Sequence, residues 1–178
     1  KYLTKDNGIR NDASVDKLGK LRTVFDKKGT VTAGNSSQVT DGGAALLLMT
    51  EEGLNKTGCT PIGKIEDYAY VGCDPKRMGL GPVHAINKLG CDINKMDLVE
   101  INEAFAAQVL ACLTQLDVPL EKLNVNSGAI ALGHPLAASG IRLVLTLTKE
   151  LAYRDLDNGL ASLCVGGGQG GAIWIKSV

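Results

Sequence analysis

Apolar residues follow two different periods along most of this chain of 178 residues. After residue 61, short apolar runs typical of strands alternate with segments in which apolar residues recur every three or four positions, as in helices. The pattern predicts strands over 62–71, 97–101, 123–126, 160–165 and 171–175, and helices over 82–89, 102–116 and 139–153. Strands that alternate with helices in the order βαβαβαββ indicate a layered α/β domain with a largely parallel sheet.

The N-terminal third of the chain has a weaker pattern. Apolar residues within 15–25 recur at helical spacing and predict one short helix. Residues 29–34 are rich in β-formers and lead into a turn or helix cap at 35–37. The continuous apolar run 44–49 predicts a fully buried strand, although the pattern alone also fits a buried helix. The polar stretch 51–61 predicts a linker or a surface helix.

Charge and length exclude two classes of protein. Lys plus Arg and Asp plus Glu number 19 each, so the formal net charge is zero and no basic block suits a nucleic-acid backbone. No stretch approaches the roughly 18 apolar residues of a membrane span. We therefore expect neither a nucleic-acid partner nor a membrane partner. Because residue 1 is Lys and no signal peptide precedes the first charged turn, we also expect the chain to begin mid-protein or after processing.

The five cysteines predict a reducing compartment. Their number is odd, they are scattered, and no pair has C-x-x-C spacing, so neither a disulfide framework nor a metal site is expected. We expect a cytoplasmic protein, or one of an organelle matrix in a eukaryote. Glycine, with 22 residues, is abundant and aromatic residues make up only 4%, which favours tight turns and close backbone approaches.

A glycine-punctuated loop at 126–140 is the first candidate for chemistry. Pro135 disfavours the α region at His134, so the imidazole is expected on an extended loop. Ser139 is expected to cap the following helix. Ligands of open α/β sheets gather at the carboxyl ends of strands, where this loop should lie. An incidental His on a surface loop is the alternative.

A second candidate is Cys164, which ends an apolar strand and enters four glycines within six residues. Glycines there let backbone N–H groups converge on a bound oxygen, as an oxyanion site requires. The alternative is a small buried cysteine beside a turn. Gly166, Gly168 and Gly171 also fit G-x-G-x-x-G, but a dinucleotide site is rejected because no helix follows. Asn102, where a strand gives way to a helix, either caps that helix or fixes a water in a site.

Together these motifs resemble one family, the thiolases. Asn102–Ala106 (NEAFA), Gly133–Pro135 (GHP) and the glycine run after Cys164 occur in the order typical of a thiolase C-terminal half. Residues 29–37, 41–42 and 78–82 also match, so the resemblance covers nearly the whole chain. Within the family the chain is most similar to acetyl-CoA acetyltransferases, with 3-ketoacyl-CoA thiolases close behind.

The resemblance implies a thiolase-like fold and a domain division. Residues 61–178 would form the C-terminal domain, a layered βαβαβαββ half with a mixed sheet. Residues 1–50 would be the last segment of the N-terminal domain, and 51–60 the linker between them. The nucleophilic cysteine would belong to an N-terminal half that these residues do not include, because none of the five cysteines has the family's nucleophile context. A homodimer or homotetramer is implied.

The resemblance also assigns roles in an acyl transfer between coenzyme A thioesters, which are substrates, with no further cofactor. His134 would activate the absent nucleophile, and Cys164 would be the acid/base at the substrate's α-carbon. His134 and a water held by Asn102 would stabilise an enolate oxygen, and the N–H of Gly166 would contribute to a second oxyanion site. Cys164 would be the most thiolate-like of the five cysteines once the full active site is assembled. Ala33 and Ser37 would line the pantetheine and Phe105 the acyl end; no role is assigned to Glu103.

Ser127 and Ala137 stand where the family usually has glycine. Serine adds a hydroxyl at the sheet end, and alanine disfavours positive φ beside the His loop. The leading hypothesis is the C-terminal catalytic portion of an acetyl-CoA acetyltransferase; a longer-chain 3-ketoacyl-CoA thiolase is the near alternative. A non-catalytic acyl-CoA or lipid-binding relative needs no acid/base thiol, and a domain that serves only assembly is a third hypothesis.

Overall fold

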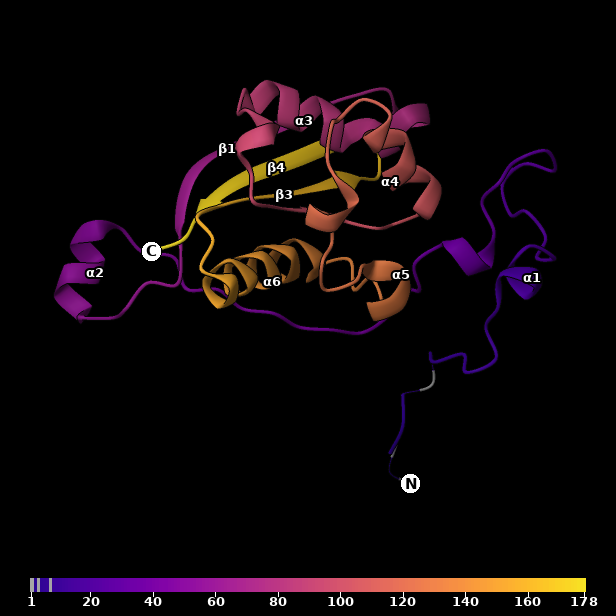
Figure 1. Ribbon diagram of the computed structural model, residues 1–178, viewed down its shortest axis with the longest axis horizontal. Helices are drawn as coiled ribbons and strands as arrows, with labels where there is room; N and C mark the ends of the chain where they lie inside the picture. The colour runs from indigo at the N-terminus through magenta and orange to yellow at the C-terminus, as the bar shows by residue number, and fades with distance from the viewer. Residues whose placement is uncertain (1, 3, 7) are drawn as a thin grey trace.

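A four-stranded mixed sheet organises the computed structural model, which describes residues 2, 4–6 and 8–178 (Figure 1). The strands are β1 (Lys64–Gly72), β2 (Leu98–Ile101), β3 (Asn158–Val165) and β4 (Gln169–Lys176), in the spatial order β1-β4-β3-β2. Only β2 and β3 pair in parallel, while β4 is antiparallel to both of its neighbours. The expectation of a largely parallel sheet is wrong, because the tight β3–β4 connection returns β4 between β3 and β1.

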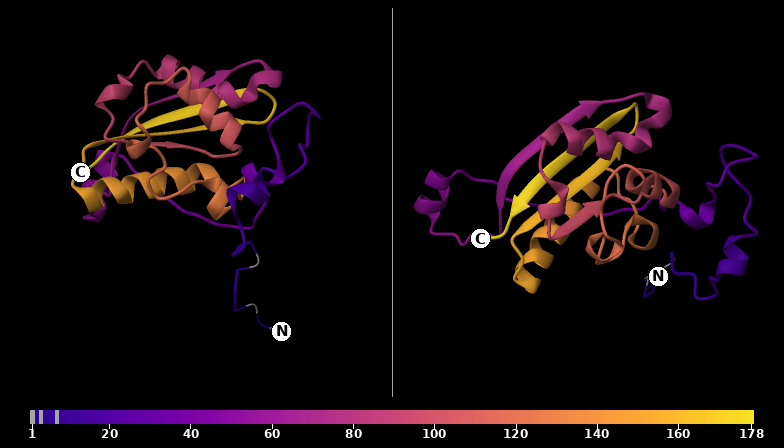
Figure 2. Two further views of the ribbon diagram at one scale, coloured as in Figure 1. Left: turned by 45° about the vertical axis from the view of Figure 1, so that its right-hand side comes forward. Right: turned by 45° about the horizontal axis from the view of Figure 1, so that its top comes forward.

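Helices cover both faces of this sheet (Figures 1 and 2). On one face lie α3 (Gly81–Leu89) and α4 (Ala106–Leu113); on the other lies α6 (Ser139–Arg154), with the short α5 (Ala129–Leu132) near its N-terminal end. Neighbouring strand residues belong to different cores, since strand side chains alternate between faces. Val99 packs in the core beneath α3 and α4, whereas Leu98 packs in the core beneath α6. The layered α/β fold is confirmed.

Two expected elements end or begin elsewhere. The helix expected from Asn102 begins only at Ala106, because Phe105 has extended backbone angles and forms a β-bridge with Ser36. The expected strand 123–126 is wrong apart from a single parallel bridge between Leu123 and Val99. Asn124 has a φ of 46°, a left-handed conformation that ends extended pairing there.

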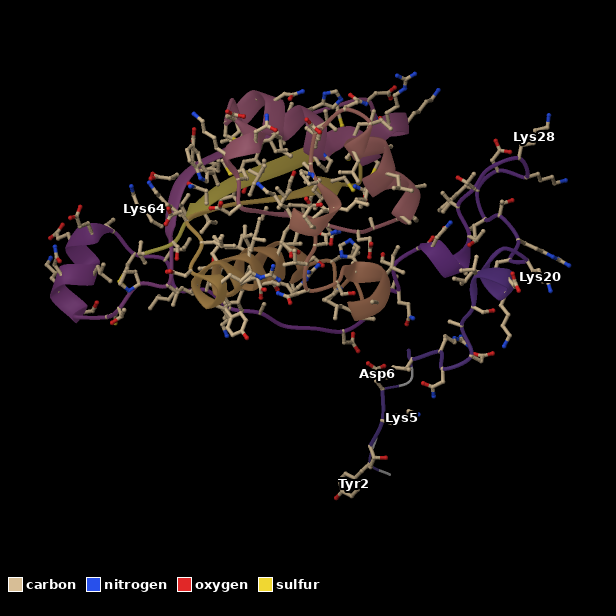
Figure 3. All side chains as sticks on the ribbon, in the orientation of Figure 1. Tyr2, Lys5, Asp6, Lys20, Lys28 and Lys64 are labelled. Carbon is tan, nitrogen blue, oxygen red and sulfur yellow. The ribbon has the colours of Figure 1, made fainter. Side chains whose placement is uncertain are left out.

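The N-terminal third runs along and away from the α/β layers. Its elements are α1 (Val15–Leu18), the 3₁₀ turn η1 (Ala33–Asn35) and α2 (Glu51–Thr57). Side chains such as Lys20 and Lys28 point into solvent (Figure 3). The three remaining 3₁₀ turns are η2 (Pro75–Leu80), η3 (Ile93–Lys95) and η4 (Leu120–Lys122).

The apolar run 44–49 is not the buried strand that its pattern predicts. Within the described residues no β-ladder forms along it, and Leu47 and Leu48 are 81% and 71% exposed. A strand of this kind is buried only when other strands flank it and helices cover it. The segment instead crosses the α6 side of the molecule in extended form (Figure 1). None of the described helices is long and apolar enough to cross a bilayer.

Candidate active site

The candidate residues meet at the carboxyl ends of β2 and β3. These strands run in parallel and in register, with Ile101 opposite Ser162. Asn102 directly follows β2, and its backbone N–H donates to the Ser162 carbonyl at 2.9 Å. Cys164 lies two residues further along β3, so both side chains belong to the same end of the sheet. That edge is where open α/β sheets bind ligands.

The loop after α5 brings His134 to this edge. Gly133 has a φ of 100°, a conformation that favours glycine, and the His134 backbone N–H donates to the Gln38 carbonyl at 2.9 Å. The half-buried ring lies with Nε2 3.2 Å from Nδ2 of Asn102, which is fully buried. The structure therefore joins two residues that are 32 positions apart. It also removes the alternative role of Asn102 as a helix cap, since α4 begins four residues later.

Hydrogen bonding on the other side of the ring fixes its tautomer. Ser139 Oγ lies 2.6 Å from Nδ1 and donates its own proton to the Pro135 carbonyl at 3.0 Å. The serine oxygen can then only accept from the ring, so Nδ1 carries the proton and Nε2 keeps a lone pair. The expected capping by Ser139 is wrong: this residue is the first of α6, and its hydroxyl serves His134 instead.

The ring is held in its neutral form. Burial, and secondarily the positive charge of Arg142, lowers the pKa of His134 below its usual value of 6.5. A neutral imidazole with a lone pair on Nε2 can accept a proton near neutral pH. His134 therefore has the protonation state that a general base needs.

Cys164 is buried at the end of β3. In this chain burial raises the pKa of its thiol, which runs against the expectation of a thiolate-like cysteine. Within the described residues no hydrogen bond joins it to His134. The neutral thiol is a proton donor, as an acid/base group must be in one direction of its reaction.

The glycine loop after Cys164 is shaped by close backbone approaches. Gly166 is exposed, and a Cβ there would meet nothing within 4 Å, so its surroundings are open. Gly168 has a φ of 90°, and a Cβ there would clash with the Cys73 carbonyl and with Pro75. The loop thus presents backbone, not side chains, at the strand end.

Two of the residues expected to line the substrate, Ala33 and Ser37, belong to the N-terminal third, whereas Phe105 lies between β2 and α4. The Ser37 backbone N–H donates to the Ala104 carbonyl at 2.9 Å, next to Phe105. The ring of Phe105 is half-buried and meets Phe25 edge-on, with centroids 5.9 Å apart. Ala33 is exposed in η1. The structure therefore brings the Ser37 backbone next to Phe105, whereas Ala33 begins the 3₁₀ turn η1, which ends before Ser37.

Sequence reasoning missed three residues around this site. Glu103 accepts a hydrogen bond from the Ile130 N–H at 3.1 Å and so ties the start of α5 to the residue after Asn102. Glu100 and Arg142 form an ion pair behind Asn102. A glutamate inside the apolar strand Leu98–Ile101 is the one feature of the sequence that indicates such a pair.

Comparison with known proteins decides the family. The family model described as "Thiolase, C-terminal domain" matches residues 59–177, two thirds of the chain. The chain belongs to the thiolase family. The model "Thiolase, N-terminal domain" matches residues 1–52. The resemblance recognised in the sequence motifs is confirmed.

Individual thiolases match over almost the whole chain. Acetyl-CoA acetyltransferase of Chromobacterium violaceum is 49% identical over 175 residues, 96% of this chain and 45% of the relative. Human mitochondrial 3-ketoacyl-CoA thiolase is 48% identical over 176 residues, 97% of this chain and 44% of the relative. The chain spans less than half the length of these relatives.

Solved thiolase structures share the fold. The acetyl-CoA acetyltransferase of Bacillus anthracis superposes with a TM-score of 0.91 at 46% identity, over 98% of this chain and 45% of that one. Human mitochondrial 3-ketoacyl-CoA thiolase in complex with CoA gives 0.88 at 46% identity, over 97% and 45%. The thiolase-like fold is therefore confirmed.

Two positions depart from the thiolase motif, with different consequences. Ser127 has a φ of 72°, so a serine occupies a left-handed conformation that glycine adopts without strain. Ala137 has no positive φ, and its methyl group is exposed. Of these two positions, only Ser127 has a backbone conformation that favours glycine.

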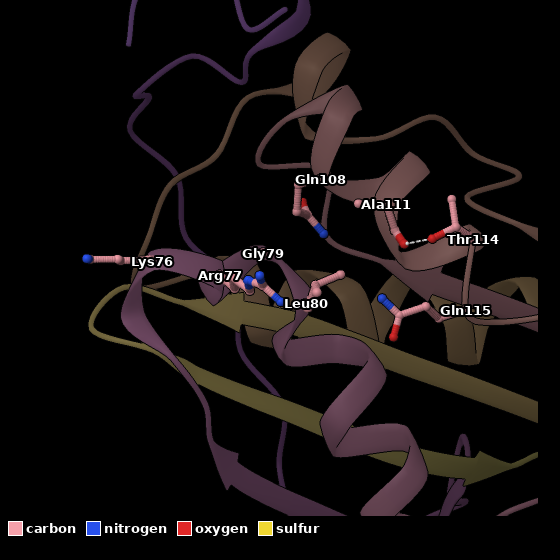
Figure 4. A pocket seen from close by; sticks show the side chains of 8 residues that line it. All are labelled: Lys76, Arg77, Gly79, Leu80, Gln108, Ala111, Thr114 and Gln115. Carbon is pink, nitrogen blue, oxygen red and sulfur yellow. Dashed lines mark hydrogen bonds between the residues drawn. The ribbon is translucent and has the colours of Figure 1, made fainter. Parts of the chain in front are cut away.

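A shallow groove of about 400 Å³ lies between η2 and α4 (Figure 4). Its lining includes Arg77 and Gln108 but none of the candidate residues of the thiolase site. Within the described residues no three His, Cys, Asp or Glu side chains gather as a metal site.

Proposed function

We propose that this chain is the C-terminal catalytic portion of an acetyl-CoA C-acetyltransferase. The enzyme would join two acetyl-CoA molecules or cleave acetoacetyl-CoA with coenzyme A. One observation carries the proposal: Asn102 and the neutral His134 form a hydrogen-bonded pair at the carboxyl ends of β2 and β3, where Cys164 also lies. Sequence identities of 49% to an acetyl-CoA acetyltransferase and 48% to a 3-ketoacyl-CoA thiolase support an acyltransferase of the thiolase type.

The first half-reaction forms an acyl-enzyme. A cysteine from a part of the protein outside these 178 residues loses its proton to Nε2 of His134. Its thiolate attacks the carbonyl carbon of the thioester, and coenzyme A leaves with the proton that His134 carries. Nε2 suits this step because Nδ1 is committed to Ser139.

The second half-reaction forms the carbon–carbon bond. Cys164, as its thiolate, removes a proton from the α-carbon of acetyl-CoA, and the resulting enolate attacks the acyl carbon. The bond from that carbon to the sulfur of the nucleophilic cysteine breaks, and this cysteine leaves as a thiolate that regains a proton from Cys164. His134 and a water held by Asn102 stabilise the enolate oxygen, while the Gly166 N–H and that of the nucleophile stabilise the oxygen of the acyl group. In the cleavage direction Cys164 returns its proton, for which its neutral thiol is suited.

A longer acyl chain is the second candidate substrate. The human mitochondrial relative, a 3-ketoacyl-CoA thiolase, is as similar to this chain as the acetyltransferases are. Phe105 would then line the longer acyl chain, with Ala33 and Ser37 along the pantetheine. A homodimer or homotetramer and a cytoplasmic or matrix location remain predictions.

Thiolysis by the complete protein tests this function. We expect cleavage of acetoacetyl-CoA by coenzyme A with ping-pong kinetics, and loss of turnover on Cys164→Ala. Comparison of kcat/KM for acetoacetyl-CoA and for 3-ketoacyl-CoA of increasing chain length distinguishes the two candidate substrates. A protein that binds acyl-CoA tightly but cleaves none of them would be a non-catalytic relative.

A further inference from the structure

A buried carboxylate lies behind the pair of His134 and Asn102. Glu100 stands within β2, all four residues of which are buried, and its side chain is only 3% exposed. Carboxylates at such positions are almost always paired. The partner is Arg142 in the first turn of α6, with Nη1 3.8 Å from Glu100 Oε2. Neither of these two atoms has a hydrogen bond within the described residues, so charge alone joins them.

The other arm of the guanidinium reaches Asn102. Arg142 Nη2 donates to Asn102 Oδ1 at 3.4 Å. Arginine has donors and no acceptor, so Asn102 must present its oxygen to Arg142. Its Nδ2 group is then directed to Nε2 of His134, at 3.2 Å, as a donor to the ring's lone pair.

The orientation of this amide matters because its two ends are nearly equal in shape. A half-turn of the side chain would exchange Oδ1 and Nδ2. The amide oxygen would then face Nε2. This oxygen repels the lone pair of Nε2 and favours a proton on that nitrogen. His134 could no longer accept a proton there, and a water on Nδ2 would lose its position.

We propose that Arg142 is a positioning residue of the thiolase site: it sets the orientation of the Asn102 amide and so decides that its Nδ2, not its Oδ1, faces Nε2 of His134, while Glu100 holds the guanidinium in place. The catalytic consequence rests on the proposed function, but the arrangement of side chains does not.

Two residues on the first turn of α6 act on opposite sides of the His134 ring. Ser139, which accepts from Nδ1, and Arg142, which orients the partner of Nε2, are three residues apart on that turn. Residues at this spacing lie on one face of a helix. Arg142 also contributes, after burial, to the lowered pKa of His134, which keeps the ring neutral.

The test uses the complete protein and avoids a stranded buried charge. Removing Arg142 alone would leave Glu100 buried without a counter-ion, which destabilises proteins strongly. Arg142→Met is therefore made together with Glu100→Gln and compared with Glu100→Gln alone. Arg154→Met, on the last turn of the same helix and partly exposed, is the matched control.

We expect Arg142→Met in this background to lower kcat for thiolysis on the order of 10- to 100-fold, because misplaced catalytic groups lose rate without losing binding. KM should stay within about threefold. Adding Asn102→Ala should cause little further loss, since Arg142 acts through that amide. Fully additive losses, or an equal loss in Arg154→Met, would overturn the proposal.

A second readout is independent of activity. In a crystal structure of the Glu100→Gln, Arg142→Met protein we expect the Asn102 amide to lose its contact with His134 Nε2. An unchanged Asn102–His134 contact would contradict the positioning role, whatever the kinetics. If the unsubstituted protein cleaves no 3-ketoacyl-CoA, the proposed function is wrong, and this structure still decides whether Arg142 positions the pair.

Discussion

At the scale of single residues, His134 connects most of the chemistry. Its Nε2 would serve both the nucleophile and the enolate oxygen, so His134→Ala in the complete enzyme is expected to lower kcat on the order of a hundredfold or more. Coenzyme A affinity should change little, because these interactions strengthen in the transition state. Steady-state kinetics and titration with coenzyme A measure the two effects. Asn102→Ala should cost less, and near-normal turnover of His134→Ala would refute the role.

Glu100 predicts an unusual dependence of stability on pH. Burial raises its pKa to about 7, against the smaller lowering effect of Arg142. The folded state then binds more protons than the unfolded state between about pH 4.5 and 7, so this residue's contribution falls as pH rises through that window. His134 acts in the opposite sense, since its lowered pKa costs stability as pH falls below 6.5.

Glu100→Gln should therefore gain stability relative to the unsubstituted complete protein as pH rises from 5 to 7, by about 3 kcal/mol at most. Urea unfolding at several pH values measures this difference, and other titrating groups cancel between the two proteins. Glu121→Gln, at an exposed position, is the control and should show a constant difference. A constant difference for Glu100→Gln as well would show that its carboxyl is not perturbed.

At the scale of elements, the sequence predicts correctly the helices and strands whose packing partners lie within these 178 residues. The helices at 82–89 and 139–153 and the paired strands β3 and β4 have partners within these residues, so their periodicity was sufficient. The run 44–49 has the same apolar character but no such partner, and it stays exposed. Motifs also pointed to Asn102, His134 and Cys164 as candidates, and the fold places them at the same end of the sheet. The contact of Arg142 with Asn102 depends on how α6 packs, which no local pattern contains.

The backbone is strained at Ser127, in the turn before α5, and this strain can be tested. Ser127 has a φ of 72°, which costs a non-glycine residue about 1–2 kcal/mol. Ser127→Gly should relieve it and raise the free energy of unfolding by about 1 kcal/mol, after the entropic cost of glycine. Denaturant titration measures the change. Ala137→Gly, at a position without positive φ, should instead lower stability by about 0.5–1 kcal/mol, so a loss in both variants would contradict strain at Ser127.

At the scale of the whole molecule, several of the exposed apolar residues lie on the α6 side of the sheet. Leu47 and Leu48 lie in the extended segment, Leu136 precedes α6, and Ile141 lies on α6. Scattered apolar residues are normal on a protein surface, but here they lie on segments that cross the α6 side of the sheet. This side is therefore the surface on which the remainder of a thiolase is expected to pack.

The 178 residues alone should not turn over acetyl-CoA or acetoacetyl-CoA. The acyl-enzyme step needs a nucleophile that the thiolase resemblance assigns to a part outside these residues, and Cys164, as the acid/base, cannot fill both roles at once. The second oxyanion site would also lack one of its two N–H donors. With Leu47, Leu48 and Leu136 more than 70% exposed, the isolated chain should self-associate or be marginally stable. The measurement is thiolysis of acetoacetyl-CoA by the purified chain, with and without an added N-terminal thiolase half, alongside its mass by light scattering. Activity that appears only on mixing would support a divided catalyst, whereas robust activity of the chain alone would require a nucleophile among its own five cysteines.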